Sequence, residues 1–179
     1  MVNPCLICAQ PGGISTLAHK PVPLRLLLDP RHLLSFGFGA GLSPWAPGTL
    51  GTIAAILPYL VLSQLSLPGY ISVLLVGFVV GIYLCDFSSR TLGVHDHGGI
   101  VWDEFIGFWI TMIAVPALNW QWLLTGFVLF RLFDIVKPWP IKMVDRSISG
   151  GFGIMLDDVL AGVYALLCMQ GLQRIMAGA

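Results

Sequence analysis

The stretch 94–104 gathers residue types that bind metals. It contains three carboxylates, Asp96, Asp103 and Glu104, and two imidazoles, His95 and His97. The whole chain has only nine acidic residues, so this density needs an explanation. Carboxylates this close in sequence repel one another unless a cation lies among them. The stretch therefore predicts a metal site.

The donor types favour Mg²⁺ over Zn²⁺ at this site. Mg²⁺ prefers one or two carboxylates together with waters and phosphate oxygens. Zn²⁺ would favour His95 and His97, but no third nitrogen or thiolate ligand accompanies them. We therefore expect at least one of Asp96, Asp103 and Glu104 to bind Mg²⁺. The alternative is that the acids only stabilise a helix start, whose positive dipole end favours carboxylates.

A second group of ionisable residues lies between positions 131 and 158. Arg131, Asp134 and Lys137 are spaced three residues apart, so they lie along one side of a helix end. Asp157 and Asp158 follow a glycine-rich loop and open an apolar segment, which repeats the arrangement of the acidic pair at 103–104. Carboxylates from several helices can converge on a metal in a bundle. The alternative is that Arg131 and Asp134 only neutralise each other.

The stretch 41–52 combines glycines, prolines and hydroxyl groups directly before an apolar segment. Free backbone N–H groups and the positive dipole end of a helix can hold an anion such as phosphate. Ser43 and Thr49 would add hydroxyl donors. The alternative is an interfacial loop in which a threonine only caps the helix.

Apolar segments separate these polar stretches, and they indicate a membrane protein. Charged residues make up only 10% of the chain, compared with about 25% in soluble domains. Positions 33–85 contain no charged residue and no histidine. This run is long enough for two membrane-spanning helices of about 20 residues each. Five apolar segments are expected, at about 50–67, 70–85, 104–118, 120–136 and 157–173. We expect an all-α integral membrane bundle of about four to five apolar helices.

The distribution of basic residues predicts the orientation of this bundle. They lie before the first apolar segment and in the two long loops, whereas the turns near 68 and 119 carry none. The positive-inside rule then places the amino terminus, both long loops and every polar cluster on the cytoplasmic face. We expect residues 1–28 to be a poorly ordered extension and residues 29–179 to form one membrane domain. The net charge is zero and no basic cluster indicates nucleic acid; no partner protein is indicated either.

Three long motifs add a family resemblance. They are GFGAGLSPWAPGTLGT at 37–52, GVHDHGGIVWDEFIGFWI at 93–110 and FRLFDIVKPWPIKMVDRSISGGFGIMLDDVLAG at 130–162. In type and order they resemble those of the phosphatidylglycerophosphatase A family, and the similarity covers roughly residues 32–179. The resemblance implies Mg²⁺-dependent hydrolysis of phosphatidylglycerophosphate to phosphatidylglycerol and inorganic phosphate. This reaction feeds phosphatidylglycerol and cardiolipin synthesis at the bacterial inner membrane.

Residue chemistry and resemblance together give the expected site, facing the cytoplasm. The expected metal ligands are Asp103, Glu104, Asp134, Asp157 and Asp158. The expected catalytic residues are Asp103, Glu104, Asp134, Asp96 and His95. His95 is included because histidine titrates near neutral pH and can protonate a leaving alkoxide. The expected phosphate-binding residues are Lys137, Arg131, Ser43 and Thr49.

Three alternatives stay open from the sequence. The substrate could be another lipid phosphate, such as phosphatidic acid. A small cation channel or transporter would distribute ionisable residues across the membrane depth, whereas here they collect in loops and at segment ends. A soluble helical bundle would suit the shorter apolar segments but not the long charge-free run.

Overall fold

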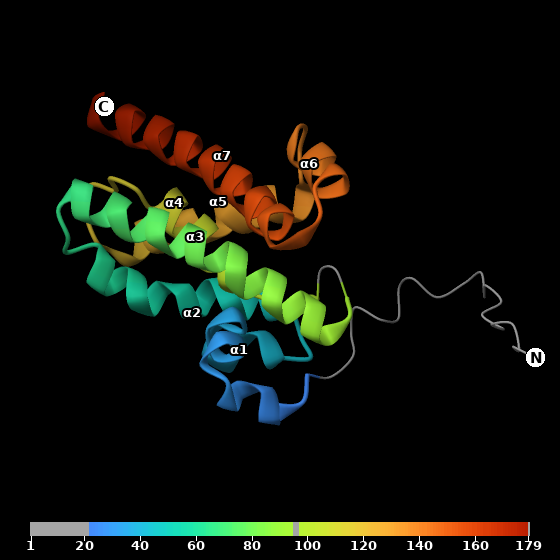
Figure 1. Ribbon diagram of the computed structural model, residues 1–179. Coiled ribbons are helices and arrows are strands. Elements are labelled where there is room, and N and C mark those ends of the chain that lie inside the picture. The colour runs from blue at the N-terminus through green and yellow to red at the C-terminus, as the bar shows by residue number, and fades with distance from the viewer. Residues whose placement is uncertain (1–21, 95–96, 179) are drawn as a thin grey trace, which may run out of the picture.

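The computed structural model describes residues 22–94 and 97–178, and every regular element within these ranges is a helix. In chain order the elements are η2 (Leu24–Leu28), α1 (Pro30–Ser35), η3 (Gly37–Leu42), α2 (Pro47–Leu62), α3 (Leu67–Leu92), α4 (Trp102–Thr111), α5 (Trp120–Val136), α6 (Ile141–Ser147) and α7 (Gly150–Gly178). The predicted all-α class is confirmed. Figure 1 shows the longer helices packed lengthwise, with α1 at one end of the bundle and α6 beside the start of α7.

Local sequence signals set the ends of these helices. Gly93 adopts a left-handed conformation with a φ of 67° and ends α3, as glycine often does after a helix. The Asn119 side chain accepts a hydrogen bond of 2.9 Å from the Trp122 N–H and caps α5. The expected segment 104–118 was too long, because α4 ends at Thr111. Pro116 lies in the turn that follows and has no N–H to continue a helix.

Helix α4 lies at the centre of the bundle, in contact with α2, α3, α5 and α7. Eight of its ten residues are buried, including the large side chains of Phe105, Ile106 and Phe108. One of its two tryptophans also makes a hydrogen bond inside the bundle, since the Trp109 indole N–H donates to the backbone oxygen of Ala55 at 2.9 Å. Polar residues on α4 are therefore held inside protein rather than at a free surface.

Two glycines let α4 and α7 approach to backbone contact. A Cβ atom added at Gly162 would lie only 2.4 Å from the backbone oxygen of Gly107, a distance that real side chains do not tolerate. A Cβ atom added at Gly107 would lie 2.8 Å from the backbone oxygen of Asp158. This close crossing brings the part of α7 that carries Asp157 and Asp158 against the start of α4. The segment expected at 157–173 begins earlier than expected, because α7 starts at Gly150, so these two acids lie about two turns inside the helix.

Among the described residues, two helices are long and apolar enough to cross a membrane, α3 and α7. At 1.5 Å per residue, their 26 and 29 residues span roughly 39 and 43 Å. Helix α2 is apolar but shorter, with 16 residues. Large apolar side chains remain exposed along both long helices, for example Val79 on α3 and Leu167 on α7. Two helices of the described part of the chain therefore meet the length for a span, and α2 is apolar but shorter.

Candidate metal and phosphate site

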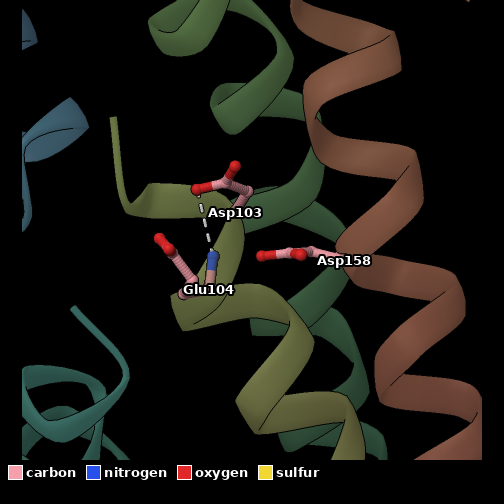
Figure 2. A group of neighbouring side chains, drawn as sticks. All are labelled: Asp103, Glu104 and Asp158. Carbon is pink, nitrogen blue, oxygen red and sulfur yellow. Dashed lines mark hydrogen bonds between the residues drawn. The ribbon is translucent and has the colours of Figure 1, made fainter. Parts of the chain in front are cut away.

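Three carboxylates converge where α4 and α7 meet. Asp103 and Glu104 occupy the first turn of α4, and Asp158 reaches them from α7. One carboxylate oxygen from each lies within 4.8 Å of the other two, and all three residues are buried. Figure 2 shows Asp103 and Glu104 side by side at the start of α4, with the side chain of Asp158 reaching toward them from α7. We call Asp103, Glu104 and Asp158 the acid trio.

The acid trio has the donor chemistry of a hard-cation site. Its ligand atoms are all oxygens, which Mg²⁺, Ca²⁺ and Mn²⁺ prefer over nitrogen or sulfur. Buried carboxylates at this spacing repel one another strongly without a positive charge among them. The Oε2 atom of Glu104 is buried and has no hydrogen-bond partner in the part of the chain that the structure describes. The residues therefore fit a divalent cation such as Mg²⁺.

Arg131 connects the acid trio to Asp134. Its guanidinium donates to the Asp134 carboxylate at 2.6 Å and lies 3.8 Å from Glu104 Oε1. The carboxylate of Asp134 also interacts with that of Asp158. The Arg131–Asp134 pair that was considered as an alternative is thus present, but it adjoins the acid trio rather than standing apart from it.

Lys137 forms a second charged centre close by. Its ammonium donates to Asp157 at 2.6 Å and to Asp145 at 2.7 Å, so it joins the end of α5 to α6 and α7. Burial alone would lower the pKa of Lys137, but the two carboxylate hydrogen bonds outweigh burial and raise the pKa above its usual value. Lys137 is therefore protonated at neutral pH. Asp157 interacts with Lys137, whereas the neighbouring Asp158 belongs to the acid trio.

The start of α2 completes this end of the bundle. A Cβ atom added at Gly48 would lie 2.3 Å from Glu104 Oε1 and 3.1 Å from a guanidinium nitrogen of Arg131. Only a glycine permits this approach of the α2 backbone. The N-cap residue is Ala46, which makes no side-chain capping hydrogen bond, so the first turn keeps free N–H groups. Thr49 lies inside this turn and is not the cap residue that the alternative interpretation expected.

Other predicted residues lie farther from the acid trio or outside the described ranges. The Ser43 hydroxyl donates to the backbone oxygen of Trp45 at 2.8 Å, so it stabilises the local turn. His95 and Asp96 lie outside the described residues. His97 is buried, and its Nδ1 accepts a hydrogen bond of 3.0 Å from the Gly99 N–H, which shapes the loop before α4.

The sequence interpretation included Gly48 only as part of the glycine-rich stretch 41–52, and it did not single out Gly107 or Gly162. Gly48 admits Glu104 and Arg131, and Gly107 faces Gly162 at the α4–α7 crossing. The only sequence signal of Gly107 and Gly162 is a small residue in an apolar segment, a few residues after an acidic pair.

A family model and two similar proteins agree on the family of this chain. Residues 33–173 match the model of the family described as phosphatidylglycerophosphatase A. The chain is 53% identical over 147 residues to phosphatidylglycerophosphatase A of Escherichia coli, covering 81% of this chain and 86% of that protein. It is 47% identical over 159 residues to the Haemophilus influenzae protein of the same name, covering 88% and 98%.

A third relative carries a different name. A Bacteroides thetaiotaomicron protein, provisionally named a phosphatidylinositol-3-phosphatase, is 40% identical over 142 residues, covering 75% of this chain and 88% of that protein. No solved structure matches the chain.

Proposed function

Because this chain belongs to the phosphatidylglycerophosphatase A family, we propose that it hydrolyses phosphatidylglycerophosphate to phosphatidylglycerol and inorganic phosphate. The observation that carries this proposal is the buried acid trio beside two cationic side chains at one end of the bundle. Such a site can hold a divalent cation and a phosphate monoester next to each other.

The acid trio is the proposed Mg²⁺ site. Asp103, Glu104 and Asp158 supply the oxygen ligands, and Asp134 is close enough to help position them. When bound, Mg²⁺ supplies positive charge that offsets the phosphate dianion and favours deprotonation of the attacking water. Asp157 is proposed as a supporting ligand or, through Lys137, as a positioning group.

Arg131 and Lys137 are the proposed partners of the phosphate oxygens. Their cationic groups are held in place by Asp134 on one side and by Asp157 and Asp145 on the other. The start of α2 lies beside Arg131, and the free N–H groups of its first turn would add donors for an anion. Thr49 belongs to this turn, and Ser43 shapes the loop that leads into it.

Hydrolysis breaks the bond between phosphorus and the glycerol oxygen and forms a bond to the water oxygen. The water gives up a proton, for which a carboxylate of the acid trio or Asp96 is the proposed acceptor. The departing glycerol oxygen takes up a proton, for which His95 is the proposed donor. Arg131 and Lys137 offset the charge that spreads over the phosphate oxygens in the transition state.

We place the site at the cytoplasmic face of a bacterial inner membrane that the chain crosses several times. The starts of α2 and α4, the third turn of α7 and the end of α5 meet around the acid trio and Lys137. This arrangement supports a single polar end on an otherwise apolar bundle. The basic residues of the loops support the cytoplasmic side.

A second substrate class is suggested by the provisional name of the Bacteroides thetaiotaomicron relative, a phosphatidylinositol-3-phosphatase. Phosphatidic acid is a further lipid with a phosphate monoester. The proposed site would bind the phosphate group through its charge, so phosphatidylglycerophosphate, phosphatidic acid and phosphatidylinositol 3-phosphate belong in the same assay.

The test is phosphate release by the purified chain in detergent, with Mg²⁺ and with a chelator, beside two variants. We expect Mg²⁺-dependent release from phosphatidylglycerophosphate that Asp103→Asn abolishes. Asp86→Asn is the matched control, because Asp86 forms a surface pair with Arg90 away from the acid trio. No release by well-folded protein would refute the activity, and full release by Asp103→Asn would refute the metal site.

A further inference from the structure

An apolar groove of about 270 Å³ lies between α3, α4 and α7. All the residues that line it are apolar, and they include Ile71, Leu75, Phe78, Ile106, Ile110 and Val159. The mechanism proposed above uses none of these residues.

The groove lies along two of the helices that carry the acid trio, α4 and α7. Ile106 and Ile110 are three and seven residues after Asp103, so all three lie on one stripe of α4. Val159 directly follows Asp158 on α7. The groove therefore begins within about one turn of the site and extends away from it along α4.

The direction of the groove follows from how α3 and α4 are paired. The Trp102 indole N–H donates to the backbone oxygen of Gly77 at 3.0 Å, and the Tyr70 hydroxyl donates to that of Trp109 at 2.6 Å. The two helices thus run antiparallel. Phe78 marks the end of the groove near the site and Ile71 the far end, roughly 10 Å away at 1.5 Å per residue.

We propose that this groove holds one acyl chain of the lipid substrate while its phosphate lies at the acid trio. The inference rests on the proposed lipid phosphatase activity. A lipid phosphate has a polar group at one end and an apolar chain at the other. The charged acid trio and the apolar groove are arranged in the same order along the helices. Ile106 at the bottom of the groove is fully buried, whereas Leu75 at the rim of the groove is 62% exposed. A chain can therefore enter sideways from the membrane.

The experiment fills the groove and compares two substrates. Leu75→Trp places a larger side chain at the rim, and Val159→Phe narrows the end near the site. Val76→Trp is the matched control, because Val76 is equally exposed on α3 but does not line the groove. Each variant is assayed with dioleoyl and with dihexanoyl phosphatidylglycerophosphate, after its elution profile and Tm show that it folds.

We expect both groove variants to lose roughly tenfold in kcat/KM on the dioleoyl lipid, as a change of about one methylene group in an apolar pocket does. Their kcat/KM on the dihexanoyl lipid should stay near the wild-type value, and Val76→Trp should change neither. Unchanged rates on both lipids, or equal losses on both, would overturn the acyl-chain groove but leave the phosphatase activity intact. A wild-type protein that cleaves neither lipid would overturn the activity itself.

Discussion

Gly162 on α7 lies against the backbone of Gly107 on α4, so closely that a Cβ atom at Gly162 would be 2.4 Å from the Gly107 oxygen. Asp158 precedes Gly162 by one helical turn, and Asp103 precedes Gly107 by one turn. The crossing of the two glycines thus sets how far apart these carboxylates are. The geometry of the acid trio depends on two residues that have no side chain.

Gly162→Ala is expected to push α7 away from α4. Added volume in a packed interior costs about 1–3 kcal/mol, so the Tm should fall. Displacement of Asp158 should reduce phosphate release roughly ten- to a hundredfold, because displacements near 1 Å have such effects on catalysis. Gly171→Ala is the control, since no atom lies within 4 Å of its added Cβ. A variant at 162 with wild-type activity would show that the crossing does not set the site.

Gly48→Ala tests the approach of α2 to the same site. The added Cβ would meet Glu104 Oε1 and the end of Arg131, which are the ends of side chains rather than backbone. We therefore expect the fold to survive while Glu104 and Arg131 move, so activity should fall at least tenfold with little change in Tm. Gly69→Ala, in the first turn of α3, is the control, because its added Cβ would make only ordinary contacts of 3.4 Å or more. Parallel losses of activity and Tm would instead indicate a packing role.

Mg²⁺ should stabilise the folded protein through the acid trio. A ligand present at one hundred times its Kd adds about 2.7 kcal/mol to the free energy of unfolding, so Tm should rise with Mg²⁺ and fall with a chelator. Asp158→Asn removes one of three mutually repelling charges. We therefore expect this variant to have a higher Tm than wild type without Mg²⁺ and to lose the response to Mg²⁺.

Asp86→Asn is the control for the Mg²⁺ response, because it removes a carboxylate from the surface pair with Arg90. It should keep the wild-type increase in Tm. If Asp158→Asn responds to Mg²⁺ as wild type does, the acid trio is not the binding site.

The sequence was sufficient to predict the helical class, because this class follows from local patterns. Apolar segments between polar loops correspond to α2, α3, α4, α5 and α7. The start of α4 was placed to within two residues, since Asp103 and Glu104 suit a helix start. Its end was placed too late, because the residues before Pro116 are apolar and nothing in their composition distinguishes a turn from a helix.

The division of the acids between partners depended on tertiary packing. Asp157 and Asp158 are adjacent and were assigned one role, but successive residues on a helix point in different directions. Asp157 therefore meets Lys137, and Asp158 meets Asp103 and Glu104. The positions of α5 and α4 against α7 decide which carboxylate meets which partner. These positions cannot be predicted from local sequence patterns.

A buried histidine outside the site gives a prediction about pH. His32 on α1 and Ser88 on α3 share a hydrogen bond of 2.9 Å between Nδ1 and Oγ, and both are buried. Burial lowers the pKa of His32, against a smaller opposing effect of Asp29. The folded state thus binds a proton less readily than the unfolded chain, whose histidine has a pKa near 6.5. This contribution to stability is present above pH 6.5 and is lost as the pH falls further.

The Tm of the wild-type protein in detergent should therefore decrease between pH 7.5 and pH 5.5. His32→Asn keeps a polar group near Ser88 but cannot take up a proton in this range. We expect it to have a lower Tm than wild type at pH 7.5, because the ring contacts with Phe36 and Phe87 are lost. Its Tm should decrease less toward pH 5.5 than that of the wild type. Equal decreases in the two proteins would mean that protonation of His32 does not destabilise the junction between α1 and α3.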